Sequence, residues 1–154
     1  MKRYFLSKKD IKDINSKYPQ ADLKKTDKVE YIKQDGLELI QINDAPGFFY
    51  KYKKLYPSLR FIHGKEQGFK KITVDMGAVK FVCSGADVMR PGIKEIDDNI
   101  EKGDTVIIVD EKNKKALAVG IALDSAQTLE NTKTGKSVKN IHYAGDRIWN
   151  FKLE

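Results

Sequence analysis

One segment of the chain, VDMGAVKFVCSGADVMRPG at residues 74–92, concentrates the residue types that can do chemistry or hold a ligand. It contains the single cysteine of the chain, Cys83, within a Cys-Ser-Gly sequence, and it ends in Arg-Pro-Gly at residues 90–92. Three functions are open for it: a cysteine nucleophile, a glycine-lined surface for a phosphate backbone, and a tight turn between core elements.

Catalytic and metal chemistry find little support in the residue pattern. A nucleophilic Cys83 needs a nearby base and a lowered pKa, whereas its apolar Phe-Val-Cys context is typical of a small buried side chain. One cysteine and two isolated histidines, His63 and His142, form no zinc-ligand spacing. The acids that border turns are better explained as turn or cap formers; they are Asp75, Asp87, Asp104 and Asp110. We therefore expect no catalytic residue, no metal and no cofactor.

A binding function needs only the residue types that are present. Glycines and small side chains let a nucleic-acid backbone approach main-chain N–H groups, while cationic and aromatic side chains contact phosphates and unstacked bases. Ser84-Gly85-Ala86 and Arg90-Pro91-Gly92 fit that description. The alternative is that Gly85 only ends a helix and that Met89 belongs to the core.

Composition and charge favour a soluble protein with a polyanionic partner. The chain has 154 residues, 40% hydrophobic and 33% charged, which is typical of one ordinary or two small globular domains. It has neither a signal-peptide apolar run nor eighteen consecutive apolar residues, so we expect a cytoplasmic protein without membrane contact. Residues 1–71 carry 17 basic against 9 acidic side chains (+8), and residues 72–154 carry 12 against 13 (−1), which sum to the formal charge of +7. The positive field thus belongs to the first half of the chain.

The first half predicts a small α+β domain over residues 1–70. Ser7 as a cap, with apolar residues spaced at i, i+3 and i+7, predicts a helix over 8–17 that Pro19 ends. VEYIKQ and LELIQIN around Asp35-Gly36 predict a hairpin, and FFYKYKK predicts a third strand. Pro57 and Ser58 can then open a short helix whose Leu59 and Ile62 face inward.

The second half, residues 71–154, predicts a mainly-β barrel. The boundary falls in the glycine- and lysine-rich GKEQGFKK at 64–71. Ala78, Phe81 and Val82 at helical spacing predict a short helix that ends at Gly85, and TVIIVD and KALAVGIAL predict a hairpin around EKNKK. Many short strands in so few residues indicate a small barrel; the strand-like runs are KITVD, DVMRPG, DTVIIVD, KALAVGIAL, SVKNIHY and RIWNFK.

These motifs in this order resemble a PUA domain, an RNA-binding module. The flanking YPSLRFIH and VKNIHYAGDRIWNFK resemble the malignant T-cell amplified sequence family, in which a pre-PUA domain precedes PUA, and the small size resembles its archaeal stand-alone members. The resemblance implies an α+β pre-PUA domain followed by a mainly-β PUA pseudo-barrel and a non-catalytic role in translation. It also implies partners: RNA, the small ribosomal subunit and a translation factor such as the density-regulated protein.

The resemblance places the RNA-contacting groove between the first helix and the second strand of the PUA module. The candidate RNA-binding residues are therefore Lys80, Ser84, Gly85, Ala86, Met89, Arg90 and Gly92, with Lys139, Asn140 and His142 on the late strand as further candidates. Trp149 and Phe151 are expected in core or interdomain packing. We expect the protein to bind structured RNA such as a tRNA acceptor end on the small ribosomal subunit. The alternative is an RNA-recognition subunit of a tRNA or rRNA modification complex.

Overall fold

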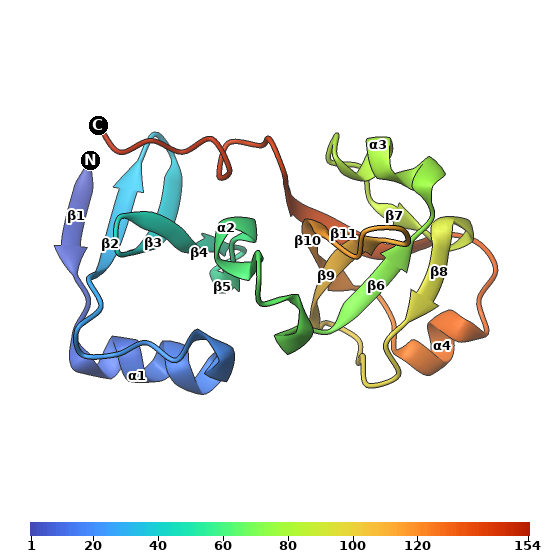
Figure 1. Cartoon of the computed structure of the whole chain (residues 1–154), viewed down its shortest axis with the longest axis horizontal. Helices are drawn as coiled ribbons and strands as arrows, with labels where there is room; N and C mark the ends of the chain where they lie inside the picture. Colours follow the sequence, from blue (N-terminus) through green and yellow to red (C-terminus); the bar gives the residue numbers. More distant parts are fainter.

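The structure, a computed structural model, describes residues 1–154 and contains two β-sheets that lie side by side (Figure 1). The first sheet is an antiparallel meander whose spatial order follows the chain. Its strands are β1 (Lys2–Phe5), β2 (Val29–Gln34), β3 (Leu37–Ile42), β4 (Ala45–Lys51) and β5 (Lys54–Pro57). The helical segments of this half are α1 (Lys8–Lys17), α2 (Leu59–Ile62) and single 3₁₀ turns at Pro19–Ala21 and Glu66–Gly68.

The predicted helix over residues 8–17 is confirmed, and so is its cap. The Ser7 hydroxyl accepts a hydrogen bond from the Asp10 backbone N–H at 3.1 Å. Ile14 is buried, and the Tyr18 hydroxyl beyond the helix end donates to the Leu55 carbonyl at 2.6 Å. A local cap signal and one apolar stripe thus suffice to form α1 and to dock it on the sheet.

Three consecutive hairpins have two-residue turns in which both residues adopt positive φ. Asp35-Gly36 has φ of 52° and 79° and confirms the predicted hairpin, and Asn43-Asp44 has 51° and 69°. The third turn, Tyr52-Lys53, has 52° and 61°. It divides the predicted single strand FFYKYKK, so that β4 ends at Lys51 and β5 begins at Lys54.

The short helix α2 forms as predicted and sits between the two sheets. The Ser58 hydroxyl accepts from the Phe61 N–H at 3.3 Å, and Leu59 and Ile62 are both fully buried. None of the helices is long and apolar enough to cross a membrane.

The second sheet is mixed and wraps into a barrel-like shape, which confirms the mainly-β expectation (Figure 1). Its order is β7-β11-β10-β9-β6-β8, with only β6 and β9 parallel. The strands are β6 (Lys71–Val74), β7 (Val88–Met89), β8 (Ile93–Ile96), β9 (Thr105–Asp110), β10 (Ala116–Ala122) and β11 (Lys136–Tyr143). The helical segments are α3 (Val79–Val82), α4 (Ala126–Glu130) and 3₁₀ turns at Met76–Ala78 and Arg90–Gly92.

Two strand predictions in the second half are wrong in part or in full. DVMRPG gives only the two residues of β7, because the 3₁₀ turn at Arg90–Gly92 ends the strand. RIWNFK forms no strand: the Asp146 carboxylate accepts from the Trp149 N–H at 2.9 Å and its carbonyl from the Asn150 N–H at 3.0 Å, which closes a turn. The strands β1 and β8 and the helix α4 were not anticipated.

One of the two apolar cores runs from the first sheet into the second, and the other lies within the second sheet. The shared core joins residues such as Phe48, Phe49 and Leu59 to Ile107, Val119 and Ile141. The C-terminal segment returns along the first sheet, so that both termini lie together (Figure 1), and Gln34 Nε2 donates to the Lys152 carbonyl at 3.0 Å. The domain boundary between residues 70 and 71 stays an interpretation, because packing is continuous across it.

Candidate nucleic-acid interface

Residues 74–92, here called the glycine-rich segment, begin with a capped helical turn. The helical turn ends at Gly85. The Asp75 carboxylate accepts from the Ala78 N–H at 2.9 Å. Gly85 has a φ of +93°, and a Cβ placed on it would lie 2.8 Å from Cε1 of Tyr143. Both the backbone conformation and the neighbouring ring therefore require glycine at this position.

Gly85→Ala should lower the free energy of unfolding by about 2–3 kcal/mol, because it adds left-handed strain and a steric clash with Tyr143. Gly135→Ala is the matched control, since Gly135 has a φ of +86° but open space around it. The control should cost about 1 kcal/mol, from strain alone. Urea unfolding of both variants measures the difference, and equal losses would mean that the Tyr143 ring simply moves away.

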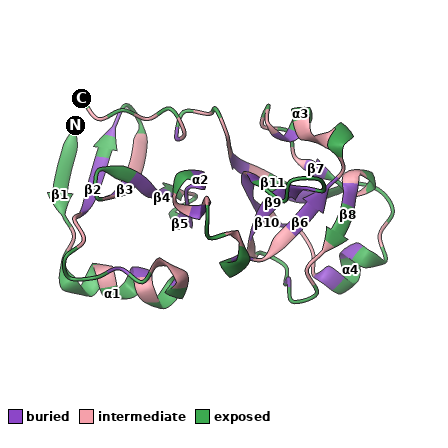
Figure 2. Ribbon diagram, in the orientation of Figure 1, coloured by how far each residue is buried: buried purple, intermediate pink, exposed green.

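The outer face of α3 presents a cation and an aromatic ring to solvent. Phe81 is 57% exposed although its spacing from Ala78, which is the same as in the predicted apolar stripe with Val82, suggested an inward side chain; Figure 2 shows exposed residues on α3. The Lys80 ammonium lies 5.1 Å from the centre of the Phe81 ring. The Ser84 hydroxyl donates to the Lys80 carbonyl at 2.8 Å, and Met89 nearby in the chain is 47% exposed. Phe81 is thus the candidate base-contacting residue that the sequence analysis missed.

Arg90 and Gly92 fix the end of the segment within the fold. Arg90 Nε donates to the Leu129 carbonyl at 2.7 Å and Nη1 to the Ile93 carbonyl at 3.3 Å, so the side chain caps the end of α4. The Gly92 carbonyl accepts from the Asp75 N–H at 2.9 Å. Contacts of Arg90 and Gly92 with RNA stay predictions, and the guanidinium has only part of its five donors left for them.

Asn140 holds the glycine-rich segment against β11. Its side-chain amide donates to the carbonyls of Val82 and Ala86, both at 3.0 Å, and its N–H donates to the Asp87 carboxylate at 2.9 Å. This amide is therefore a positioning group for the turn that carries Ser84 and Ala86, both of which are exposed. Lys139, its neighbour in β11, is exposed, and its ammonium lies 4.8 Å from the centre of the Tyr52 ring.

His142 is not part of the surface, which corrects the expectation of an RNA contact. It is 1% exposed, and its ring packs edge-on against Phe49 with centroids 5.1 Å apart. Nε2 accepts from the Leu59 N–H at 3.1 Å, so Nδ1 carries the proton and donates to the Asp146 carboxylate at 2.8 Å. Burial alone would raise the pKa of Asp146, but the hydrogen bonds from His142 and two backbone N–H groups outweigh it and lower that pKa.

Cys83 and the C-terminal aromatic residues occupy packing positions. Burial raises the pKa of the half-buried Cys83 thiol, which disfavours the thiolate that a nucleophile requires. Trp149 and Phe151 pack against the core shared by the two sheets, as predicted. The Arg60 guanidinium carbon lies 4.2 Å from the centre of the Trp149 ring.

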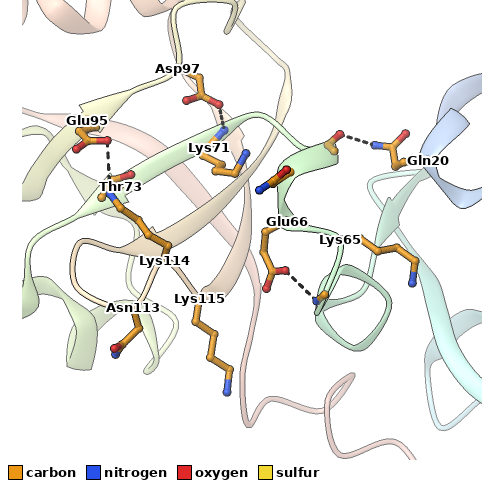
Figure 3. Close-up of a pocket in the computed structure, with 13 residues that line it drawn as sticks. Gln20, Lys65, Glu66, Lys71, Thr73, Glu95, Asp97, Asn113, Lys114 and Lys115 are labelled. Atoms are coloured by element: carbon orange, nitrogen blue, oxygen red, sulfur yellow. Dashed lines mark hydrogen bonds and ion pairs between the residues drawn. The ribbon is translucent and has the colours of Figure 1, made fainter.

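A large cleft lies elsewhere, at the linker between the sheets (Figure 3). It has a volume of about 920 Å³ and no hydrophobic lining residue, and none of its lining residues comes from α3 or from the turn that follows it. Four lysines face three carboxylates there, and Lys114 pairs with Glu95 at 3.5 Å. Apolar and aromatic lining is typical of small-molecule sites, and this cleft lacks it. We therefore assign the candidate RNA interface from the residue types of the glycine-rich segment and not from the size of the cleft.

Comparison with known proteins adds independent information on both halves. A family model described as PUA domain matches residues 70–144, and one described as Domain of unknown function (DUF1947) matches residues 2–65. An uncharacterized protein of Methanocaldococcus jannaschii is 42% identical over 157 residues, covering 98% of this chain and 97% of the relative. Translation machinery-associated protein 20 of Saccharomyces cerevisiae is 34% identical over 137 residues, covering 84% and 76%.

Solved structures agree with these relatives. The crystal structure of a hypothetical protein from Pyrococcus horikoshii has a TM-score of 0.84 at 35% identity and covers 96% of this chain and 98% of that chain. A more partial likeness, with a TM-score of 0.52 at 27% identity, is to a chain in a structure of an H/ACA RNP bound to a substrate RNA; it covers 63% of this chain and 29% of that chain. With a DUF1947 domain followed by a PUA domain, the chain belongs to the family of the translation machinery-associated protein 20 and malignant T-cell-amplified sequence proteins.

Proposed function

We propose that the protein is a non-catalytic RNA-binding protein of the translation machinery, and that it holds structured RNA such as a tRNA acceptor end on the small ribosomal subunit. The observation that carries the proposal is the outer face of α3, where exposed Phe81 and Lys80 adjoin the exposed turn of Ser84 and Ala86. An aromatic face beside an ammonium group is suited to an unstacked base and its phosphate. Membership of a family whose relatives are named for the translation machinery supports the process.

Several residues of the proposed surface shape it rather than touch RNA directly. Asn140 and Gly85 shape the turn, whereas Lys80, Ser84, Ala86 and Met89 present side chains or backbone to solvent. Arg90 and Gly92 remain in the proposed interface at its edge, with Arg90 anchored by two backbone carbonyls. We therefore assign direct RNA contacts first to Lys80, Ser84, Ala86 and Met89.

A second candidate function is RNA recognition within a modification complex. The likeness to a chain of an RNA-bound H/ACA RNP favours it, while the relatives that cover most of this chain favour translation. Co-sedimentation of the tagged protein with small ribosomal subunits from its own cells would support translation. Co-purification with a modifying enzyme, and absence from the subunit fractions, would instead support the second candidate.

Phe81→Ala should weaken binding of a tRNA transcript by about 1–3 kcal/mol, the range measured for one base stacked on an aromatic side chain. Stability should change by less than about 0.5 kcal/mol, because the ring is mostly exposed. Electrophoretic mobility shift or fluorescence titration at fixed salt measures the first effect. The matched control is Phe5→Ala on β1, where another exposed ring lies in the first sheet away from α3. Equal affinity for the two variants would remove Phe81 from the interface.

A further inference from the structure

The β4–β5 turn breaks the residue rule that the other two hairpins of its sheet obey. Two-residue turns with positive φ at both positions favour Asn, Asp and Gly, and Asp35-Gly36 and Asn43-Asp44 conform. Tyr52-Lys53 does not, although its φ values of 52° and 61° are the same kind of conformation. Bulky residues are strained there, and strain held by the surrounding fold is concentrated at functional sites.

Burial does not explain the choice of tyrosine. Tyr52 is 54% exposed and belongs to neither hydrophobic core. An Asn-Gly turn would close the same hairpin with less strain. The side chain at this position therefore has a use other than folding the first sheet.

The turn reaches across to the last strand of the second sheet. The Lys51 ammonium donates to the Ile141 carbonyl of β11 at 3.3 Å and lies 5.7 Å from the centre of the Tyr52 ring. The Lys139 ammonium, from β11 itself, lies 4.8 Å from the same ring. The contact with Tyr52 raises the pKa of the Lys139 ammonium above its ordinary value. Two cations from two strands thus flank one exposed aromatic ring.

The cluster of Tyr52, Lys51 and Lys139 adjoins the glycine-rich segment along β11. Lys139 precedes Asn140, whose amide holds the Val82 and Ala86 carbonyls of the glycine-rich segment. In Figure 1, β4 and β5 are the strands of the first sheet nearest to the second sheet. A strand of RNA that contacts Ser84 and Ala86 can therefore continue over the edge of β11 onto the first sheet.

We infer that Tyr52 is a stacking platform for an unpaired base of the bound RNA, with Lys51 and Lys139 contacting the flanking phosphates. An aromatic face beside a cationic groove is the arrangement by which proteins hold single strands with little base preference. The inference rests on the proposed function and extends its surface to the first sheet, where the positive charge of the chain is concentrated.

The test is a titration of the full-length protein with a short, labelled single-stranded RNA oligonucleotide at fixed salt. Tyr52→Leu should lower affinity about tenfold, because it removes the ring, whereas Tyr52→Phe should stay within about twofold of wild type because stacking needs only the ring face. Phe5→Leu is the matched control, an exposed aromatic on β1 that should bind as wild type does. Circular dichroism checks that each variant is folded.

The outcomes separate this inference from the proposed function. If the wild type binds the RNA and Tyr52→Leu equals the Phe5→Leu control, the stacking platform is overturned while RNA binding stands. If Tyr52→Phe is as weak as Tyr52→Leu, the hydroxyl contact with Lys139 matters and not the ring, which also overturns stacking. Absence of wild-type binding at low salt would overturn the proposed function and this inference with it.

Discussion

Replacement of His142 by leucine should lower the free energy of unfolding by about 3–5 kcal/mol, the largest stability effect among the variants that we propose. The imidazole joins three distant parts of the molecule. It accepts from the Leu59 N–H at the start of α2, donates to the Asp146 carboxylate and packs edge-on against Phe49 of β4. Leucine fills the space but leaves a buried N–H and a mostly buried carboxylate without the imidazole that pairs with both.

The measurement for this prediction is equilibrium unfolding in urea at neutral pH. His63→Leu is the matched control: His63 is only half-buried, and its one ring hydrogen-bond contact is with the Ala116 carbonyl at 3.2 Å. The control should lose about 1 kcal/mol. If both variants lost the same small amount, the hydrogen bonds of His142 would not join the sheets as the distances indicate.

RNA affinity should fall about a thousandfold between 50 and 200 mM salt, the second large effect. Such a loss corresponds to a slope of about −5 for log affinity against log salt concentration, and so to about seven phosphates neutralised by basic side chains at about 0.7 each. The excess of eight positive charges in residues 1–71 provides enough cations for this count, whereas residues 72–154 carry a net charge of −1. Filter binding or fluorescence titration of a tRNA transcript at both salt concentrations measures the loss. An affinity that does not change with salt concentration would exclude an RNA-binding surface built on basic side chains.

An isolated second domain is a poor choice for measuring how much each half of the chain contributes to the salt dependence of RNA binding. Ile107, Val119 and Ile141 of the second sheet belong to the same core as Phe48 and Leu59 of the first, so the fragment would expose apolar surface. Variants of the intact chain avoid the problem. Lys53 and Lys54 follow Tyr52 at the β4–β5 turn, so we include them in the proposed RNA surface. Both are exposed and can be changed to glutamine without disturbing that core.

Features set by neighbouring residues were predictable from the sequence. The Ser7 cap of α1, the Asp35-Gly36 turn and the Ser58 cap of α2 each depend on residues within a few positions, and each is found in the structure. The β9–β10 hairpin around EKNKK also follows from its polar turn between two apolar runs. Family resemblance then supplied the arrangement of the two halves, which local patterns do not encode.

Features set by distant partners were not predictable. The burial of His142 depends on Leu59, 83 positions away, and no local sequence pattern predicts that contact. The division of FFYKYKK depends on a turn whose residues, Tyr52 and Lys53, disfavour the conformation that they adopt. The four-residue helix α3 buries only Val82 and leaves Phe81 exposed, which the apolar spacing of its residues did not predict. Two of these three departures fall on the surface that we assign to RNA, where local preference and function compete.

The most direct test of a two-sheet RNA surface is the salt dependence of tRNA binding by the intact protein, compared with its Lys53→Gln, Lys54→Gln variant. The wild type should bind at low salt with a steep slope of log affinity against log salt concentration. The variant should have a shallower slope, by about 0.7 for each phosphate that its side chains no longer neutralise. Lys2→Gln, Lys33→Gln, at the far edge of the first sheet, is the matched control and should keep the wild-type slope. A wild type that fails to bind tRNA at low salt, or a Lys53→Gln, Lys54→Gln variant with the unchanged slope, would contradict the account.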